Sequence, residues 1–478
     1  MPMIKRLSSS FFHYSIILFL SLILIFCARV LYSNVGEAPI YNDEPSWMQG
    51  AYFYHLLFIK KDILNKDWDS FISYDQPPVA KYIFGFLLNS YNHKDIDSNG
   101  GLMQWQLSTI IPEYNAPLIK FIHQQENPFD RKLLEYNNSL LLQIKLARVV
   151  PLDQQDYKLC RRAVFIIGLF ATALLIIIGS YVFKNIIPGL MAGIFFLTNH
   201  TVIKVFLLAL VDSMCCFFVL SSLLVLFWLF HGLKTKGSKR RVVAVSILEG
   251  LLLSLALGTK LITTYILVTV VLVFVASILF EIFKSVKAKN DIPVKIISVR
   301  VALLSLILTC AFSFFVLFNP FLYRDPIGGI IKMDHHRMML MQMQSRTQSG
   351  GIKSFSQRIS AVCKNGILMG NDNLNIFESF SYFFIFVVGL GVLIKKSYGE
   401  LCTGFLGPPT ILILWIATTF ILNGAMIHIK WDRYFIPFMM CVSLIIGSGT
   451  SEMLDLLVVR LIKFKDYLFK RPQDQNPS

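Results

Sequence analysis

Apolar stretches recur along the chain and are separated by short polar segments that hold most of its charges. A helix needs about 20 mostly apolar residues to cross the hydrocarbon core of a bilayer, and several stretches approach or exceed that length. We therefore predict an all-α polytopic membrane protein with about ten transmembrane helices in one bundle. The predicted spans are residues 15–31, 161–183, 190–205, 213–230, 242–257, 262–283, 301–318, 377–394, 410–422 and 434–446.

Two long segments, residues 34–160 and 319–375, break this pattern because neither contains an apolar run long enough to span a bilayer. Within the first, residues 47–59 and 79–89 carry aromatic and aliphatic side chains at helical spacing with polar ones between them. This pattern predicts amphipathic helices along the membrane interface. The predicted layout is a transmembrane domain over residues 1–459, which includes the loop 34–160 and the segment 319–375, followed by a basic tail over residues 460–478.

Composition supports the same class of protein. The chain is 55% hydrophobic and 15% charged, with a mean hydropathy of +0.60, which excludes an ordinary soluble enzyme. Its net charge of +16 is divided among clusters such as Lys5-Arg6, residues 234–241 and Lys395-Lys396. These clusters fall on one side of the alternating spans, so the positive-inside rule places them and both termini in the cytoplasm. The positive charge therefore reflects topology and predicts no nucleic-acid partner.

Polar residues that are unusual near a membrane gather on the opposite, extracytoplasmic side of this topology, at or near the ends of spans. They are Asp43, Glu44, Gln76, Arg148, Asp212, Lys260, His335, His336, Arg337 and Arg433. Singly, such residues have structural explanations, for example a helix cap for Asp212 or a side chain that reaches toward water for Lys260. As a set on one face, they indicate a functional site.

Acids and cations on one face suggest a particular chemistry. A carboxylate can act as a general base toward a hydroxyl or amine, while cations stabilise a departing phosphate. The sequence contains no Gly-x-x-x-x-Gly-Lys-Ser/Thr loop to bind a nucleotide. We therefore predict a donor that reaches the outer side through the bilayer, which means a lipid-linked phosphate.

Several motifs of this chain also occur in the order found in one family. They are Asp43-Glu44, the Asp-Gln-Pro-Pro-Val-Ala-Lys-Tyr stretch of residues 75–82, Ala147-Arg148, residues 208–214, Gly258-Thr259-Lys260, residues 319–326, His335-His336-Arg337, and Arg433-Tyr434 with Pro437. The ordered series resembles the polyprenyl-phosphate-dependent glycosyltransferases, which include the protein O-mannosyltransferases and the aminoarabinose transferases of lipid A. The resemblance covers nearly the whole chain.

The resemblance implies a GT-C-type fold, in which an outer cavity binds a sugar on dolichyl or undecaprenyl phosphate. It implies transfer of a mannose-like hexose or related sugar, with inversion at the anomeric carbon, to a protein, lipid or glycan acceptor. Asp43 is then the general base, Glu44 orients the acceptor or the donor, and Asp212 braces the site. The residues implied to bind the donor phosphate or substrate are Gln76, Arg148, Lys260, His335, His336, Arg337, Arg433 and Tyr434. For the two histidines, a place on the surface of an amphipathic helix is an equal alternative.

Two positions depart from the family pattern. Gln76 stands before Pro77-Pro78, where the family usually has a cation or histidine, and Ser46 stands where the aminoarabinose branch carries arginine. A neutral amide can donate a hydrogen bond to a phosphate but adds no charge. Both departures argue against the aminoarabinose branch and leave the phosphate to other cations.

No cofactor is expected. Asp43, Glu44, His335 and His336 could assemble a metal site in space, but nothing in their spacing requires one, and the eight cysteines show no metal-ligand spacing. A lipid-linked sugar flippase or transporter is the main alternative, although it should place polar residues near mid-span, as only Glu249 does. A catalytically inactive scaffold is another. The small layout favours a multi-pass protein of a prokaryotic plasma (inner) membrane, with an extracytoplasmic site.

Overall fold

The computed structural model describes residues 2–41, 43–69, 73, 77–91, 152–235, 237–289, 291–347, 351–352, 354–367, 376–427 and 429–468. Apart from one isolated β-bridge between Gly351 and Ile429, every regular element in these ranges is a helix. The long helices are α1 (Pro2–Ser33), α8 (Gln154–Phe183), α11 (Asp212–Lys234), α12 (Lys239–Thr259), α13 (Thr264–Lys287), α14 (Val294–Phe318), α15 (Pro326–Thr347), α17 (Ile376–Cys402), α18 (Pro408–Met426) and α19 (Ile436–Leu468). The shorter α-helices are α2 (Glu44–Gln49), α3 (Tyr52–Tyr54), α5 (Val79–Ser90), α9 (Ile186–Leu197), α10 (His200–Phe206) and α16 (Phe355–Val362). Single 3₁₀ or π turns are η1 (His55–Ile59), η2 (Lys66–Asp69), η3 (Leu261–Thr263), η4 (Pro320–Leu322), η5 (Cys363–Ile367) and η6 (Asp432–Phe435).

The number of spans agrees with the sequence pattern. Nine helices of the described part are long and apolar enough to cross a membrane, and the bent pair α9 and α10 makes a tenth if it counts as one span. The prediction of an all-α membrane protein with about ten spans is therefore confirmed. In the two long polar segments, the described residues form α2, α3 and α5 before the second span, and α15 and α16 after residue 319.

One predicted span is not a straight helix. Residues 190–205 are predicted to cross as one span, and the two helices that form this span, α9 and α10, meet at an angle of 69°. The break falls at Asn199, whose backbone is extended and whose side chain accepts a hydrogen bond from the N–H of Val202 at 3.1 Å. Asparagine at this position caps the start of α10, and a capping residue cannot also continue the preceding helix.

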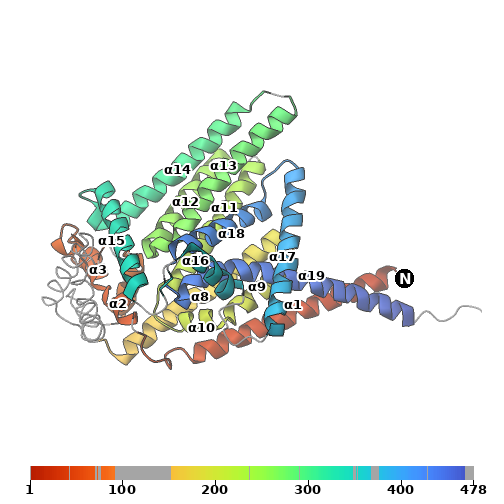
Figure 1. The fold of residues 1–478 in the computed structure, drawn as a ribbon, viewed down its shortest axis with the longest axis horizontal. Helices are drawn as coiled ribbons and strands as arrows, with labels where there is room; N and C mark the ends of the chain where they lie inside the picture. The colour runs from red at the N-terminus through yellow and green to blue at the C-terminus, as the bar shows by residue number, and fades with distance from the viewer. Residues whose placement is uncertain are drawn as a thin grey trace, which may run out of the picture.

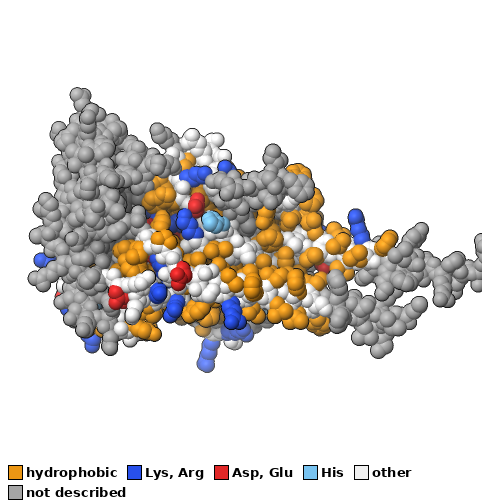
Figure 2. Space-filling model, turned by 90° about the horizontal axis from the view of Figure 1, so that it is seen from below, with side chains coloured by type: hydrophobic (Ala, Val, Ile, Leu, Met, Phe, Trp, Pro, Cys, Tyr) orange, Lys and Arg blue, Asp and Glu red, His pale blue; other side chains and the backbone are white. Residues whose placement is uncertain are grey.

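The short helices α2 and α3 and the helix α15 gather at one end of the molecule. Figure 1 shows α2, α3 and α15 together on the left, where α14 ends, whereas the N-terminus of α1 and the connection between α13 and α14 lie on other sides. The span α11 is central: 78% of the residues in its most apolar stretch are buried, compared with only 6% in α1 and 17% in α17. Large apolar surfaces on outer helices are expected when lipid is the solvent. Figure 2 shows such orange apolar surface over much of one face.

Small residues allow some of these helices to pack closely. A side chain on Gly389 of α17 would overlap the carbonyl oxygen of Ile445 on α19, and Gly449 meets α17 in the same way. Gly447 of α19 likewise lies against the backbone of α9 at Pro188. Close approach through small residues is the usual basis of helix association in membranes, because burial of apolar surface gives little driving force there.

We expect Gly389→Val to destabilise the bundle by about 1–3 kcal/mol, because the added methyl groups would force α17 away from α19. Thermal unfolding in detergent should show a lower Tm than wild type. Gly391→Val is the matched control, since it lies on the same helix and has no atom within 4 Å of its added Cβ. Equal Tm values for the two variants would contradict this account of the crossing.

Candidate functional site

A buried ion pair between Glu44 and Arg161 holds the loop that precedes α2. Arg161 Nε and Nη2 donate to the two carboxylate oxygens of Glu44, at 2.7 Å each, and both side chains are buried. Glu44 also accepts from the backbone N–H groups of Ala209 and Tyr41, at 2.7 Å each, and Arg161 donates to two carbonyls of the loop. This network fixes the neighbouring Asp43 relative to α8 and to the segment that leads into α11.

Arg161→Lys should lower stability by about 1.5–3 kcal/mol, because lysine keeps the charge but cannot form the two parallel bonds to Glu44. Thermal unfolding in detergent measures the loss. The control is Arg162→Lys, at the next position, where the side chain is exposed. If both variants unfold at the same temperature, the ion pair does not hold the loop.

Asp43 lies opposite Arg433, although the two are far apart in the sequence. Asp43 precedes α2, and Arg433 lies in the turn η6 that leads into α19, with Asp43 Oδ2 and Arg433 Nη1 2.5 Å apart. The guanidinium also lies over the rings of Trp431 and Tyr434, 4.9 and 5.6 Å from their centroids, which favours this orientation. Because 29% of the Asp43 side chain is exposed while Glu44 is fully buried, Asp43 is the accessible acid of the two.

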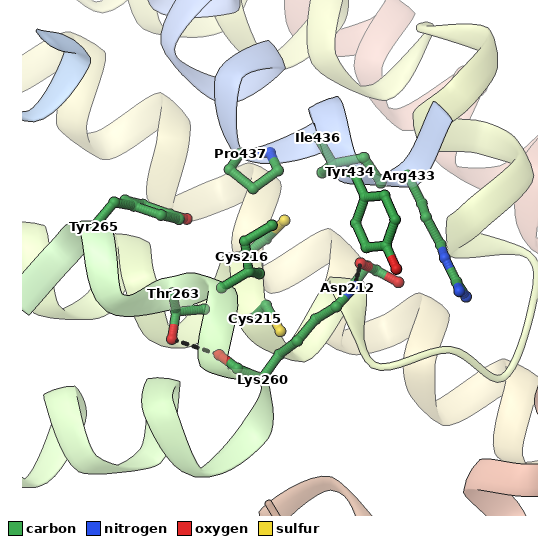
Figure 3. A pocket seen from close by; sticks show the side chains of 11 residues that line it. Asp212, Cys215, Cys216, Lys260, Thr263, Tyr265, Arg433, Tyr434, Ile436 and Pro437 are labelled. Atoms are coloured by element: carbon green, nitrogen blue, oxygen red, sulfur yellow. Dashed lines mark hydrogen bonds and ion pairs between the residues drawn. The ribbon is translucent and has the colours of Figure 1, made fainter. Parts of the chain in front are cut away.

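A second ion pair lies beside the first. Lys260 at the end of α12 reaches Asp212, the first residue of α11, with Nζ and Oδ1 2.8 Å apart. The ammonium group also lies 5.0 Å from the centroid of the Tyr434 ring. In Figure 3 the Tyr434 ring, the Asp212 carboxylate and Arg433 lie close together, with Lys260 extended toward Asp212. The two ion pairs therefore meet around Tyr434.

Both pairs border one small cavity, which Asp212, Lys260, Arg433 and Tyr434 line together with apolar residues. Two of its buried polar atoms, Asp212 Oδ2 and Arg433 Nε, have no hydrogen-bond partner within the described part of the chain. Buried polar atoms usually have partners in a finished structure. Such atoms at a cavity wall are suited to bind a polar ligand.

A neighbouring cavity shares Tyr434 and Ile262 with the first. Its other walls are mostly apolar, with side chains such as Met341 and Met426, and its charged member is Arg337 of α15. Arg337 and Tyr434 line it together. The two cavities are lined by three cations, Lys260, Arg337 and Arg433, which face the carboxylate of Asp212 in the lining and that of Asp43, the partner of Arg433. The excess of one positive charge favours an anionic ligand.

Tyr41 belongs to the same charged neighbourhood. Burial raises the pKa of its phenol, and although Arg433 acts in the opposite direction, the net shift is upward. Tyr41 therefore remains neutral at physiological pH and can donate a hydrogen bond.

The structure brings most, but not all, of the predicted site residues together. Those that meet are Asp43, Asp212, Lys260, Arg337, Arg433 and Tyr434. On α15, His336 is buried and His335 is exposed, and neither lines the two cavities. Glu44 is enclosed by Arg161. Gln76 and Arg148 lie outside the described residues.

Sequence reasoning missed Arg161 and Trp431. Arg161 was assigned only to the start of a span, and because its partner Glu44 lies 117 residues earlier, no local pattern indicates the ion pair. Trp431 precedes Asp432-Arg433, and an aromatic residue next to an arginine at a membrane edge could have indicated the stacking that the structure shows.

A metal site does not form from the candidate ligands that the structure describes. Within that part of the chain, no group of three or more His, Cys, Asp or Glu side chains is placed to hold a metal ion. Asp43 and Glu44 turn to different partners, Arg433 and Arg161.

Comparisons with known proteins support the resemblance drawn from the motifs. Residues 132–322 match the family model described as dolichyl-phosphate-mannose-protein mannosyltransferase. This region includes Asp212 and Lys260 but is less than half of the chain. The chain is thus similar to these mannosyltransferases over that region.

Among solved structures, the chain is similar to the archaeal oligosaccharyltransferase AglB from Archaeoglobus fulgidus, determined in complex with an inhibitory peptide and a dolichol-phosphate. The alignment covers 98% of this chain and 53% of AglB, with 12% identity and a TM-score of 0.49. The chain thus spans about half the length of that protein. A sequence search of curated proteins gives no match.

Proposed function

We propose that the protein is a membrane glycosyltransferase of the GT-C type, which transfers a mannose-like hexose or related sugar from a polyprenyl-phosphate donor to an acceptor. The observation that carries the proposal is the meeting of two acid–cation pairs, Asp43–Arg433 and Asp212–Lys260, around one cavity at the ends of membrane helices. The match of residues 132–322 to a mannosyltransferase family supports the same class of reaction.

In this mechanism Asp43 is the general base. Its Oδ2 pairs with Arg433, and we assign Oδ1 to the proton of the acceptor hydroxyl. As that proton passes to Asp43, the acceptor oxygen forms a bond to the anomeric carbon from the side opposite the phosphate. The bond between the anomeric carbon and the phosphate oxygen breaks, and the phosphate leaves with its electron pair. Attack from the opposite side inverts the anomeric configuration.

The cations stabilise the leaving phosphate. Negative charge develops on its bridging oxygen as the glycosidic bond breaks, and preorganised cations near that oxygen lower the barrier. Lys260 and Arg433 line the smaller cavity and Arg337 the larger one, so a phosphate beside Tyr434 is within reach of all three. The apolar walls of the larger cavity suit the first isoprene units of the donor lipid. Glu44, held by Arg161, acts as a positioning residue for Asp43.

We place the site on the extracytoplasmic side of a prokaryotic plasma membrane. The helix ends on the other side carry basic residues such as Lys234, Lys284 and Lys396, which the positive-inside rule assigns to the cytoplasm. The acceptor then approaches from outside, while the donor arrives through the bilayer.

The test is a turnover assay with the full-length protein in vesicles. A panel of polyprenyl-phosphate sugars is presented with a serine peptide, a glycolipid and a free glycan as acceptors, and the release of polyprenyl phosphate is measured together with the labelled product. We expect one donor to turn over. Movement of a donor across the bilayer without release of polyprenyl phosphate would instead support the flippase alternative. If no donor is turned over and none is moved across the bilayer, the proposal is contradicted.

A further inference from the structure

A separate cavity shares only Arg433 with the Asp212–Lys260 cavity. Its inner wall is apolar, with Val205, Leu208 and Leu210 from α10 and the segment that follows it, and Trp431 from the segment before η6. We call it the Lys204–Lys430 cavity, after the two lysines at its edge. Since Arg433 borders both spaces and Asp43 is paired with it, a ligand in this cavity lies next to the proposed general base.

The charge of this cavity is unbalanced. Lys204 and Lys430 are both exposed, and neither pairs with a carboxylate among the residues that the structure describes. The one acid in the lining is Asp432, which is also exposed. Arg433 is left out of the charge balance because Asp43 already compensates it. Two ammonium groups against one carboxylate leave a net positive charge beside an apolar wall, which attracts an anion from solution. Figure 2, which views the molecule from the side where α10 lies in Figure 1, shows basic side chains interspersed with a few acidic ones in an otherwise apolar surface.

The remaining polar lining suits a ligand that also carries hydroxyl groups. Tyr41 lines the cavity and stays neutral, so its phenol can donate or accept a hydrogen bond. Asp432 can accept hydrogen bonds from hydroxyls. Donors and acceptors of this kind set beside fixed charges give specificity for a polar, charged molecule rather than for a lipid tail.

We propose that the Lys204–Lys430 cavity is the acceptor subsite and that its acceptor carries an anionic group, a phosphate or a carboxylate, close to the hydroxyl that receives the sugar. This inference rests on the proposed glycosyltransferase function. The two lysines hold the anionic group, and the hydroxyl faces Asp43 across Arg433. The donor phosphate occupies the other side of Arg433, at the cavities around Tyr434. The anionic group of the acceptor and the donor phosphate thus lie on opposite sides of the Asp43–Arg433 pair, and the acceptor hydroxyl meets the anomeric carbon beside Asp43.

The first test is chemical and does not depend on turnover. Pyridoxal 5′-phosphate forms an imine with a lysine amine, with loss of water, and borohydride then fixes it as a secondary amine that mass spectrometry can locate. With the full-length protein in nanodiscs, we expect Lys204 or Lys430 to be labelled at concentrations at least tenfold lower than Lys61 and Lys66, which are exposed lysines elsewhere. Pyridoxal, which lacks the phosphate, should show no such preference. Equal labelling of all four lysines would overturn the proposal.

The lipid bilayer is the competing source of phosphate groups. Labelling is therefore compared in nanodiscs of phosphatidylcholine and in nanodiscs containing phosphatidylglycerol. Protection of Lys204 and Lys430 by phosphatidylglycerol, but not by a soluble acidic glycan, would show that the cavity holds lipid headgroups and would overturn the acceptor assignment. Protection by the acidic glycan in both kinds of nanodisc would support it.

The second test measures selectivity between acceptors. Each acceptor class is offered as a matched pair, with and without an acidic group beside the hydroxyl, and the ratio of kcat/KM within each pair is determined. We expect wild type to favour the acidic member by at least tenfold, and Lys204→Gln/Lys430→Gln to lose most of that preference through a higher KM. The control Lys61→Gln/Lys66→Gln makes the same change in charge. Equal use of both members by wild type would overturn the inference but leave the glycosyltransferase function standing. Selective labelling without turnover of any donor would show an anion-binding cavity but overturn both the glycosyltransferase function and the acceptor assignment.

Discussion

Asp43→Asn should lower the rate of sugar transfer by about 10²–10⁴, the usual contribution of a general base. Asparagine keeps the shape of aspartate and can still accept the bond that Arg433 donates, but it cannot take the acceptor proton. The loss should therefore appear in kcat, with little change in the KM for the donor. Vesicle assays that follow the release of polyprenyl phosphate over a range of donor concentrations measure both quantities.

Two controls distinguish this loss from a structural defect. Asp69→Asn makes the same chemical change at a side chain that is 73% exposed and paired with Lys332 on the surface, and it should retain wild-type activity. In Asp43→Ala, added formate supplies a small carboxylate and should restore part of the rate. If Asp43→Asn keeps a rate within tenfold of wild type, Asp43 is not the base, and another acid near Arg433 must be sought.

The sequence predicts the spans well because each depends on local composition. A stretch of apolar residues must be buried in lipid or protein whatever its neighbours do. At residues 190–205, where the structure bends the predicted span, the bend has a local cause as well. The hydropathy of Thr198-Asn199-His200 dips only briefly, so the run still counts as apolar, but one asparagine in a capping conformation is enough to bend the chain by 69°.

The contacts within the candidate site are harder to predict from the sequence. Nothing in the pattern around Asp43 indicates that its partner is Arg433, because that contact depends on how the first loop packs against the start of α19. The adjacent Asp43 and Glu44 also look equivalent in the sequence. The structure separates them, since Glu44 begins α2 and turns inward to Arg161, while Asp43 pairs with Arg433, which lines the cavity. Family resemblance supplied the site residues, and the fold supplies their different environments.

Lys260→Met should lower kcat/KM for the donor by about 10²–10³, the range found when one stabilising donor is removed from an active site. Methionine has a similar length and fills similar space, so the variant loses mainly the charge that opposes the leaving phosphate. It also removes the cation that pairs with Asp212, whose side chain is more than nine-tenths buried, so thermal stability should fall as well. The single variant therefore cannot separate a catalytic role from a structural one.

The double variant Asp212→Asn/Lys260→Met separates these roles, because it removes both charges of the pair. If Lys260 acts on the phosphate, the double variant should recover most of the lost Tm while its kcat/KM stays low. Recovery of both would show that Lys260 only neutralises Asp212, and the leaving phosphate would then depend on Arg337 and Arg433. The two residues touch, so their effects are expected to be non-additive, and the coupling in stability need not equal the coupling in kcat/KM. If the two substitutions are coupled in stability but not in kcat/KM, Asp212 has a structural role and Lys260 acts in catalysis.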